Sequence, residues 1–594
     1  MASTTSPTTP TERRGGSWLL AETPPQEAFT PERMTEEQRL IDQTTREFVT
    51  NEVVGQNDEL EKKNWDLARR LLLRCGELGI LGTDVPEAYD GISLDKVSSA
   101  IIASRLGQSG SFSTTFGAQT GLAVLPIRMF GTEDQKRRYL PKLVSGEMVG
   151  AYCLSESGSG SDALGAKTRA VQQEDGSFVL NGEKMWISNG GFADVYIVFA
   201  KVDGEKFTAF IVERAFPGVS SGEEEHKMGL NGSSTTPVLF QDAQVPAENL
   251  LGEIGKGHKV AFNVLNYGRF KLGAATVGST QTAIGEAARY AAERHQFGQP
   301  IASFGAIKHK LGEMTVRAYA IESMVFRTAG LIDAKLEGHA EDDDQALLDA
   351  LEEYAIEASI LKVAGSEMLD YVLDENIQIH GGNGYVKDYP AERHYRDSRV
   401  NRIFEGTNEI NRLLIPGMLA RRALKGHLPI IEAAKQLQDE LLSPSGPPTG
   451  SNSLLGPQEA AVAMFKKVSL AVLGLAMQTY REKLSDQQEV MSWTADILID
   501  TFAAESVVLR ARQIGDTNTG TASLQADAAR VFVNDASGRI ELSARSALAA
   551  MAEGDTLRMH LAALRRLLKV NPLNTVEIRR RLAEHAVTRA GYIF

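Results

Sequence analysis

The residues best suited to proton chemistry lie in one heptapeptide at 402–408, Arg-Ile-Phe-Glu-Gly-Thr-Asn. Glu405 follows an apolar Ile-Phe pair, and burial against such side chains raises the pKa of a carboxylate toward the range useful for proton abstraction. The glycine after it lets the backbone approach a ligand closely, and the Thr-Asn pair adds hydrogen-bonding groups. The alternative is a surface glutamate that opens an ordinary turn, so the heptapeptide alone leaves both interpretations open.

Two further segments have side chains suited to ligand binding. The Gly-Ser-Gly-Ser run at 158–161 offers backbone N–H groups and hydroxyls to an anionic or carbonyl-rich ligand, although an ordinary loop has the same composition. It lacks the strand and helix that flank a dinucleotide-binding Gly-x-Gly-x-x-Gly motif. Trp186 precedes a polar turn at 187–191, so it either covers a planar ligand or packs in the core, the usual place for a tryptophan. His380 has no cluster of carboxylates and histidines at ligand spacing, which predicts no metal site.

The texture of the chain changes along its length and predicts an α+β protein dominated by helices. Apolar residues recur at helical spacing before residue 150 and again after residue 259. Between them, short β-rich runs are separated by Asp-Gly and Pro-Gly pairs. The predicted order is a flexible N-terminal tail (1–34), an N-terminal helical domain (35–150), a β domain (151–258), a helical bundle that holds Glu405 (259–425), a Pro/Gly/Ser-rich linker (426–458) and a C-terminal helical domain (459–594).

Composition places the chain among multidomain globular proteins. Its 594 residues are 42% hydrophobic and 24% charged, and the length predicts three or four domains. The net charge of −14 argues against nonspecific nucleic-acid binding. Cys75 and Cys153 form no disulfide framework and suit a reducing compartment. The first thirty residues lack the apolar core of a secretory signal, and we expect no membrane span of ~20 apolar residues; the stretch at 468–477 comes nearest.

Several motifs resemble, in the right order, those of the acyl-CoA dehydrogenases. The resemblance covers roughly residues 36 to 425 and is closest to the very-long-chain subgroup, which carries an added C-terminal helical region. It implies an N-terminal helical domain, a central β-barrel-like domain, a four-helix-bundle domain with the catalytic glutamate and an extra C-terminal helical domain. The motifs are Gly-Thr-Glu-Asp-Gln-Lys at 131–136, Tyr-Cys-Leu-Ser-Glu-Ser-Gly-Ser-Gly-Ser-Asp at 152–162, Lys-Met-Trp-Ile-Ser-Asn-Gly-Gly at 184–191, Arg-His-Gln-Phe-Gly at 294–298, Gln-Ile-His-Gly-Gly-Asn-Gly at 378–384 and the heptapeptide at 402–408.

The resemblance implies FAD as the cofactor. Tyr152, Leu154 and Ser155 are expected to contact the flavin, Trp186 to cover one of its faces, and Ser188 to hydrogen-bond near its N5 atom.

The same resemblance places further cofactor-binding residues across a subunit interface, which requires at least a homodimer. Two of them match residues on the pyrophosphate and adenine side, and two match a complementary strip of the second subunit. A simple helix-end cation is the alternative for the arginine. The residues expected to bind the cofactor in addition to those above are Arg294, Phe297, Gln378, Gly382, Thr407 and Glu409.

The reaction implied is the FAD-dependent α,β-dehydrogenation of a fatty acyl-CoA to trans-2-enoyl-CoA in fatty acid β-oxidation. Glu405 is expected to remove the α-proton while the β-hydride passes to the flavin. Some relatives carry the base immediately before a matched arginine; here that arginine is Arg269 and the preceding residue is Gly268, so no second carboxylate competes. The expected substrate contacts are Ser161, Asn266, Arg269 and Gly406.

Substrate length, electron acceptor and location are expectations of the same kind. Long acyl chains are expected because Ala123 falls where long-chain members keep small residues, although Pro126 replaces the glycine expected there. Electron-transfer flavoprotein is the expected acceptor; an acyl-CoA oxidase and a family member with a mainly assembly or scaffold role are the alternatives. The C-terminal unit either packs on the bundle or contacts a membrane peripherally. A short, weakly basic N-terminus favours a bacterial cytoplasm over a mitochondrial matrix.

Overall fold

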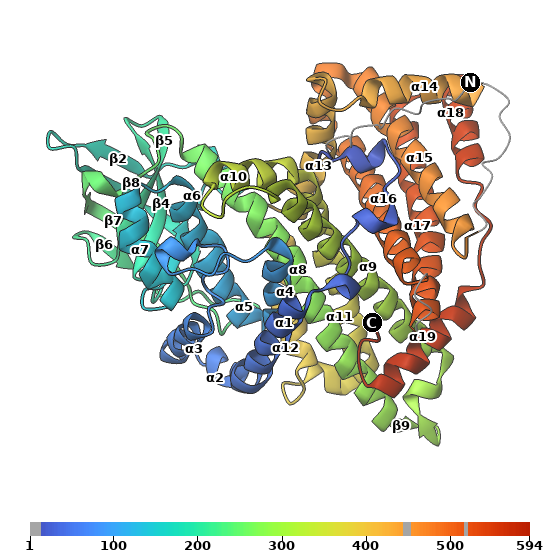
Figure 1. Cartoon of the computed structure of the whole chain (residues 1–594), viewed down its shortest axis with the longest axis horizontal. Coiled ribbons are helices and arrows are strands. Elements are labelled where there is room, and N and C mark those ends of the chain that lie inside the picture. The colour runs from blue at the N-terminus through green and yellow to red at the C-terminus, as the bar shows by residue number, and fades with distance from the viewer. Residues whose placement is uncertain (1–12, 443–452, 516–520) are drawn as a thin grey trace, which may run out of the picture.

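A long helical bundle forms the centre of the molecule, with a β domain at one end and a C-terminal helical domain along the opposite side (Figure 1). The computed structural model describes residues 13–442, 453–515 and 521–594. The predicted α+β class dominated by helices is confirmed.

The N-terminal helices begin at strong local signals. Thr35 accepts a hydrogen bond from the backbone of Gln38, whose side chain accepts one from the backbone of Thr35, and Thr132 and Gln135 repeat this capping box. The helices of this domain are α1 (Glu36–Phe48), α2 (Asn57–Glu61), α3 (Trp65–Glu77), α4 (Lys96–Leu106), α5 (Gly110–Gly117), the wide helical segment η7 (Ala118–Val124), α6 (Leu125–Phe130) and α7 (Glu133–Ser145).

The middle domain is an eight-stranded sheet whose hydrogen-bonded path runs β6-β7-β3-β2-β4-β5-β8, with β1 paired to β4. The predicted short β-rich runs, at 178–180, 195–202, 207–212 and 237–240, all lie in strands, but two of the strands are considerably longer, because β3 and β7 pair along most of their eleven residues. The strands are β1 (Gly150–Cys153), β2 (Arg169–Gln172), β3 (Phe178–Ser188), β4 (Val195–Val202), β5 (Lys206–Glu213), β6 (Val219–Ser221), β7 (Thr235–Val245) and β8 (Leu250–Leu251).

The bundle is built mainly from four helices that pack on one another, α8, α9, α11 and α13. Its longest helix, α8, reaches from the β domain to a short hairpin, β9–β10, at the far end of the bundle (Figure 1). The elements are α8 (Gly257–Glu293), β9 (His295–Gln296), β10 (Gln299–Pro300), α9 (Gly305–Leu336), α10 (Asp344–Glu353), α11 (Ala355–His380), α12 (Ala391–Ser398) and α13 (Asn408–Leu424).

The C-terminal domain adds a second helical layer against α9 and α13. The expected linker at 426–458 contains a helix, α14, so it is only in part a connector; its residues 443–452 lie outside the described part of the chain. The helices are α14 (Ile430–Leu442), α15 (Gly456–Tyr480), α16 (Gln488–Gly515), α17 (Ala522–Met551), α18 (Gly554–Leu567) and α19 (Thr575–Arg589).

The prediction of a flexible tail at 1–34 is wrong for residues 13–34, which pack along the bundle and the C-terminal domain. Trp18 is 5% exposed, and its indole N–H donates to the buried Glu357 of α11 at 3.0 Å. Glu32 accepts from the guanidinium of Arg510 on α16 at 2.7 Å. These partners are hundreds of residues away along the chain, so the sequence of the segment itself does not show them. Its polar composition alone therefore suggested disorder. Residues 1–12 lie outside the described residues.

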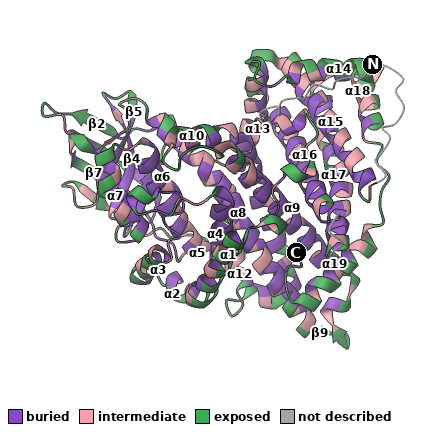
Figure 2. Ribbon diagram, in the orientation of Figure 1, coloured by how far each residue is buried: buried purple, intermediate pink, exposed green. Residues whose placement is uncertain are grey.

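The apolar helix α15 corrects the expectation that no segment of the chain is long and apolar enough to span a membrane. The segment Gly456–Asp486 is long and apolar enough, by length and composition, to cross a membrane, with a mean hydropathy of 1.7 over its most apolar window. Half of that window is buried inside the molecule, and α15 packs against α16 and α17. Figure 2 shows buried residues running through the bundle and the C-terminal helices. The helix therefore behaves as the core of its domain, the commoner fate of such a segment.

Candidate active site

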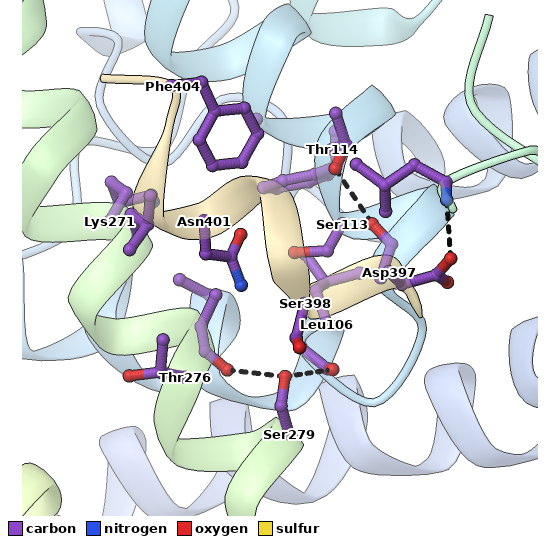
Figure 3. A pocket seen from close by; sticks show the side chains of 18 of the residues that line it. Leu106, Ser113, Thr114, Lys271, Thr276, Ser279, Asp397, Ser398, Asn401 and Phe404 are labelled. Atoms are coloured by element: carbon purple, nitrogen blue, oxygen red, sulfur yellow. Dashed lines mark hydrogen bonds between the residues drawn. The ribbon is translucent and has the colours of Figure 1, made fainter. Parts of the chain in front are cut away.

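A cavity lies between the N-terminal helices and the bundle, and Glu405 closes one part of its wall. Small residues on α5, η7 and α8 line its length, and Figure 3 shows Thr276 and Ser279 of α8 facing the same space as Asn401 and Phe404. Four glycines line the cavity on the side of the N-terminal helices, Gly107, Gly110, Gly117 and Gly121. At Gly117 and Gly121 an added methyl group would meet no atom within 4 Å, so these two positions face open space.

The carboxylate of Glu405 is prepared for proton transfer. The surrounding protein dehydrates it and raises its pKa to about 7, against the opposing attraction of Arg269 and Lys362. Its Oε2 atom has no hydrogen-bond partner among the described residues, so it is available to a ligand in the cavity. Its backbone is in the left-handed region, with φ of 58°, a conformation that is costly for a residue with a side chain and that concentrates at functional sites.

The backbone around Glu405 is fixed by donors from two helices. The Asn411 side-chain amide donates to the carbonyl oxygens of residues 405, 406 and 407 at 3.3, 2.9 and 3.0 Å. Arg269 donates from Nε to the carbonyl of Glu405 at 3.2 Å and from Nη1 to Asn266 at 3.0 Å. Thr407 caps α13 by accepting from the backbone of Ile410 at 3.2 Å. The strained turn is thus held from both sides.

Gly268 leaves the space that the carboxylate occupies. A Cβ atom at this position would lie 2.5 Å from Oε2 of Glu405 and 2.8 Å from its Cδ. Residue 268, where some relatives carry the base, is therefore a glycine here, and the side chain of Glu405 occupies the space beside it.

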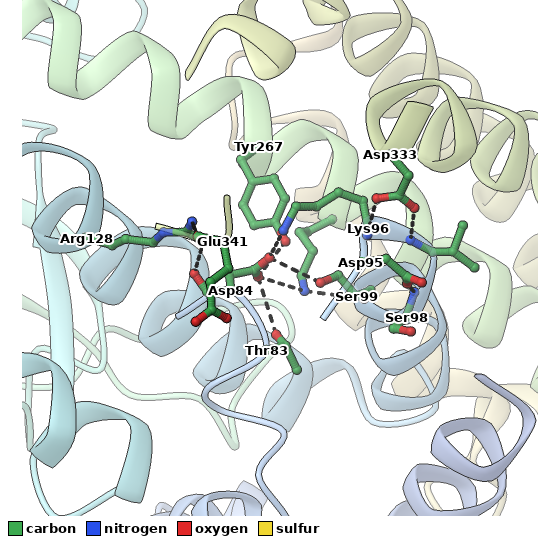
Figure 4. A network of polar contacts seen from close by, with 12 residues as sticks. Thr83, Asp84, Asp95, Lys96, Ser98, Ser99, Arg128, Tyr267, Asp333 and Glu341 are labelled. Carbon is green, nitrogen blue, oxygen red and sulfur yellow. Dashed lines mark hydrogen bonds and ion pairs between the residues drawn. The ribbon is translucent and has the colours of Figure 1, made fainter. Parts of the chain in front are cut away.

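A buried ionic network holds the stretch of α8 that carries Gly268 and Arg269 (Figure 4). Tyr267 donates its hydroxyl to Asp84 at 2.6 Å, and Lys271 lies 4.0 Å from the same carboxylate. Lys96 of α4 also pairs with Asp84, and these cations hold the pKa of Asp84 below its usual value against the effect of burial. The network locks α8 to the N-terminal domain, and one of its members, Lys271, lines the same cavity as Glu405.

The predicted flavin-side residues come together at the edge of the sheet. The pairing of β3 with β7 shifts register between Lys184 and Ile187, and Trp186 lies in this bulge with φ of 59° and 57% of its surface exposed. Bulges commonly re-aim a side chain beside an active site. Ser188 lines the same cavity as Glu405, and the backbone N–H of Met185 donates to the carbonyl of Ser155 at 2.9 Å.

This arrangement fits a planar cofactor. The Ser188 residue and the carboxylate with the unpartnered oxygen border one cavity, the exposed indole ring lies two positions before Ser188 on the same strand, and Tyr152 and Leu154 are buried on the neighbouring strand segment. A flavin ring stacked on Trp186 would find an aromatic face and one donor there. The structure therefore brings the segment that carries Tyr152, Leu154 and Ser155 beside the strand that carries Trp186 and Ser188, and their contact with the flavin stays a prediction.

A second set of predicted cofactor residues lies elsewhere. Gly268 to Glu293 is 25 residues of α8, or about 38 Å of helix, so Arg294 is far from the Glu405 turn. Phe297 is 92% exposed on the β9–β10 turn, and Gln378 and Gly382 are exposed at the end of α11, whereas Glu409 is exposed on the first turn of α13, close to Glu405. A single chain does not bring Arg294 and Phe297 to Glu405.

The substrate-side predictions divide in the same way. Asn266, Arg269 and Gly406 cluster at the Glu405 turn, where an added Cβ on Gly406 would lie 3.5 Å from Nη2 of Arg269. Ser161 is exposed in the loop after β1. That loop is anchored by Glu156, which pairs with the buried Lys184 at 2.7 Å.

Sequence reasoning missed several residues of this site. The residues expected to set the tunnel, Ala123 and Pro126, are not in the cavity wall; Gly117 and Gly121, which precede them by two to nine residues, are. Lys362, whose amine lies near Glu405, is the only charged residue between Glu357 and Glu367 in an apolar helix, a signal that could have found it. No local pattern distinguishes Asn411, which acts on a turn that precedes it.

Comparison with known proteins agrees with this geometry. Four family models match the chain: the acyl-CoA dehydrogenase N-terminal domain at 35–147, the middle domain at 151–243, and two C-terminal domain models at 255–419 and 464–566. A probable acyl-CoA dehydrogenase of Bacillus subtilis (strain 168) is 48% identical over 96% of this chain and 97% of its own length. The mitochondrial very long-chain specific acyl-CoA dehydrogenase of Rattus norvegicus is 37% identical over 77% of this chain and 71% of its own.

A solved structure of an acyl-CoA dehydrogenase has the same fold and contains FAD. The crystal structure of an acyl-CoA dehydrogenase complexed with FAD from Bacillus anthracis superposes with a TM-score of 0.96 at 48% identity, covering 98% of this chain and 100% of that one. FAD is the cofactor of this family, and the cluster around Trp186 and Ser188 fits it. The motifs, the domain order, the site geometry and these matches together establish that the chain belongs to the acyl-CoA dehydrogenase family.

Proposed function

We propose that the chain dehydrogenates long-chain fatty acyl-CoA to the trans-2-enoyl-CoA, with Glu405 as the base that removes the α-proton. The observation that carries this proposal is the Glu405 carboxylate, whose pKa is raised to about 7 and whose Oε2 atom is unpartnered beside the Ser188 edge of the cavity.

The residues of this chain have separate tasks in that step. FAD, when bound, supplies the acceptor for the β-hydride. Glu405 takes the α-proton on its free oxygen, and Asn411 and Arg269 keep its backbone still by binding its carbonyl. Arg269 and Lys362 stabilise the carboxylate before the proton arrives, so that a usable fraction is deprotonated near neutral pH. The apolar and small side chains of the cavity exclude water from the reacting carbons.

The form of the cavity supports a long acyl chain. It runs from the Glu405 edge along α5, η7 and α8, and two of its glycines face open space. A chain lying there would be stabilised by about 0.8 kcal/mol for each methylene that leaves water.

The exposed second set of residues supports a homodimer. An aromatic side chain that is 92% exposed leaves its whole apolar face available to a second surface, and its burial there would be favourable. A second copy placing its Phe297 and Arg294 against the adenine side of FAD would account for their exposure and for their distance from Glu405. The exposed Gln378 and Gly382 would then lie at the same interface.

Electron-transfer flavoprotein is the acceptor that this proposal includes, and a direct reaction with oxygen, as in an oxidase, is the second candidate. A bacterial cytoplasm, with peripheral contact between the C-terminal domain and a membrane, completes the proposal. The low cysteine content and reduced thiols at Cys75 and Cys153 suit that compartment.

Anaerobic titration of the purified flavoprotein tests the reaction. Palmitoyl-CoA is expected to bleach the flavin absorbance, and Glu405→Gln is expected to retain FAD and lose bleaching. Bleaching at the wild-type rate in Glu405→Gln would move the base elsewhere. Oxygen consumption after anaerobic reduction, with and without electron-transfer flavoprotein, separates the two acceptors.

A further inference from the structure

A continuous chain of buried polar groups leads away from the Glu405 turn. It starts at Lys362 of α11, which is fully buried and donates from Nζ to Oδ1 of Asn408 at 2.6 Å. Asn408, the first residue of α13, donates in turn to Ser366 at 3.0 Å and to Glu367 at 2.9 Å. The residue three positions after the proposed base is thus tied to α11 by three hydrogen bonds.

The chain continues into the C-terminal domain. Glu367 accepts two bonds from the guanidinium of Arg412 on α13, at 2.6 and 2.8 Å. Arg412 also donates from Nε to Asp496 of α16 at 2.8 Å. Because bidentate arginine–carboxylate pairs fix geometry as well as charge, α11, α13 and α16 are joined in one defined arrangement.

Lys362, at the start of this series of polar groups, is destabilising to bury in its charged form. An ammonium group without a directly bound carboxylate is costly to bury, and desolvation lowers the pKa of Lys362 to about 7 although Glu405 attracts its charge. A methionine would fill the same space without that cost. A buried lysine beside the proposed base therefore indicates a role in positioning the carboxylate or in favouring its ionised form.

Few charged groups face Glu405, so the contribution of each can be separated. Arg269 faces it from α8 and Lys362 from α11, and the only other titratable group coupled to it among the described residues is the buried hydroxyl of Tyr152 on β1. Glu409 and Glu367 also attract the charge of Lys362 and so raise its pKa against the effect of burial.

We propose that Lys362 is a positioning residue for Glu405, and that Asp496 makes the C-terminal domain part of the active-site scaffold by holding the far end of the same chain through Arg412 and Glu367. This inference rests on the proposed role of Glu405 as the base. Lys362 holds the first turn of α13 through Asn408 and attracts the carboxylate across the cavity wall. Asp496 touches neither substrate nor base and acts only through the groups between.

Lys362→Met tests the first half with a measurement that needs no turnover. The protonated-carboxyl infrared band that disappears in Glu405→Gln reports the titration of Glu405 in the FAD-loaded enzyme. Loss of the cation is expected to raise the pKa of that band by about one unit, and the pH profile of flavin reduction is expected to move the same way. Lys466→Met is the control for the loss of a buried cation away from Glu405, because Lys466 is also buried but donates to Glu505 of the C-terminal domain. An unchanged band in Lys362→Met overturns this half.

Asp496→Asn tests the second half at a partly exposed residue, so the variant is expected to fold. The rate constant of anaerobic flavin reduction is expected to fall about three- to thirtyfold, with the half-saturating palmitoyl-CoA concentration unchanged. Asp500→Asn is the control: Asp500 lies one turn further along α16, and it pairs with Arg539 of α17. Equal rates in the two variants overturn the role of the C-terminal domain.

The outcomes separate this inference from the function on which it rests. If Glu405→Gln still reduces the flavin, the proposed base is wrong. If Glu405→Gln is inactive while Lys362→Met and Asp496→Asn match the wild type, only the positioning role is wrong. Should Lys362→Met fail to fold, the Asp496→Asn and Asp500→Asn pair decides the question.

Discussion

Replacement of Gly268 by alanine is a minimal change with a large expected effect on the rate. The new methyl carbon would lie 2.5 Å from Oε2, 2.8 Å from Cδ and 3.0 Å from Oε1 of Glu405, whereas ordinary contact begins near 3.4 Å. The carboxylate must therefore retreat by about 0.9 Å. Its backbone cannot follow, because Asn411 and Arg269 bind its carbonyl and its φ of 58° is already strained. The displacement must come from the side chain.

A shift of about 1 Å at a reacting group costs about a hundredfold in rate, or about 2.7 kcal/mol of activation free energy. We expect Gly268→Ala to lose about that factor in the rate of flavin reduction by palmitoyl-CoA, measured by stopped flow under anaerobic conditions. Alanine is the better helix former by about 1 kcal/mol, so the melting temperature should stay the same or rise. FAD content should not change.

Gly285→Ala on the same helix is the matched control. The methyl group there meets only the movable guanidinium of Arg289 at 3.1 Å and a carbonyl at 3.5 Å. It should gain helix stability and keep its rate. A Gly268→Ala enzyme that reduces its flavin within threefold of the control would refute the idea that this glycine makes room for the base.

Four further predictions concern the pH dependence of Glu405, the cavity and the proposed dimer interface. The rate of flavin reduction should rise with pH through about 7, because Glu405 accepts a proton only when charged; a midpoint below about 5.5 would contradict the dehydrated carboxylate. Since the pKa of Glu405 lies above its ordinary 4.5 in the folded protein, its contribution to stability is present at low pH and is lost as pH rises through about 7. Glu405→Gln should therefore raise the free energy of urea unfolding of the FAD-free protein at pH 8.5, by up to about 3 kcal/mol, and leave it nearly unchanged at pH 5. Gly121→Leu should fill the cavity and reduce the rate with palmitoyl-CoA far more than with butyryl-CoA; equal losses would place the acyl chain elsewhere. Phe297→Asp should leave the fold intact but yield monomers with little bound FAD, as measured by light scattering and flavin absorbance, and a flavin-loaded dimer would speak against the proposed interface.

The sequence was most informative where the residues of a motif are neighbours along the chain. Glu405, the glycine after it and the capping Thr407 form one turn, and Trp186 and Ser188 lie two positions apart on one strand. Local backbone geometry decides such groups, so the order of residue types is informative. The domain order was predictable for a similar reason, because helical and strand periodicities extend over tens of residues.

Contacts between distant segments were not predictable in this way. The ordered packing of residues 13–34 depends on Glu357 and Arg510, and the linker helix α14 depends on packing against α15. The residues predicted to line the tunnel were two to nine positions away from the glycines that do, because which face of η7 meets the cavity depends on how it lies against α8.

Sequence alone therefore predicts the chemistry of this protein: a glutamate base in a glycine-containing turn, an aromatic and a hydroxyl for a flavin, and a helical protein with a β domain between. Tertiary structure decides what suits that glutamate to the proposed role of base. Its raised pKa comes from the protein packed around it, its space from Gly268 on another helix, and its support from Lys362 and Asn411. Dehydration and Coulomb attraction act through space over a few ångströms, and only the fold brings residues 268, 362 and 405 within that range.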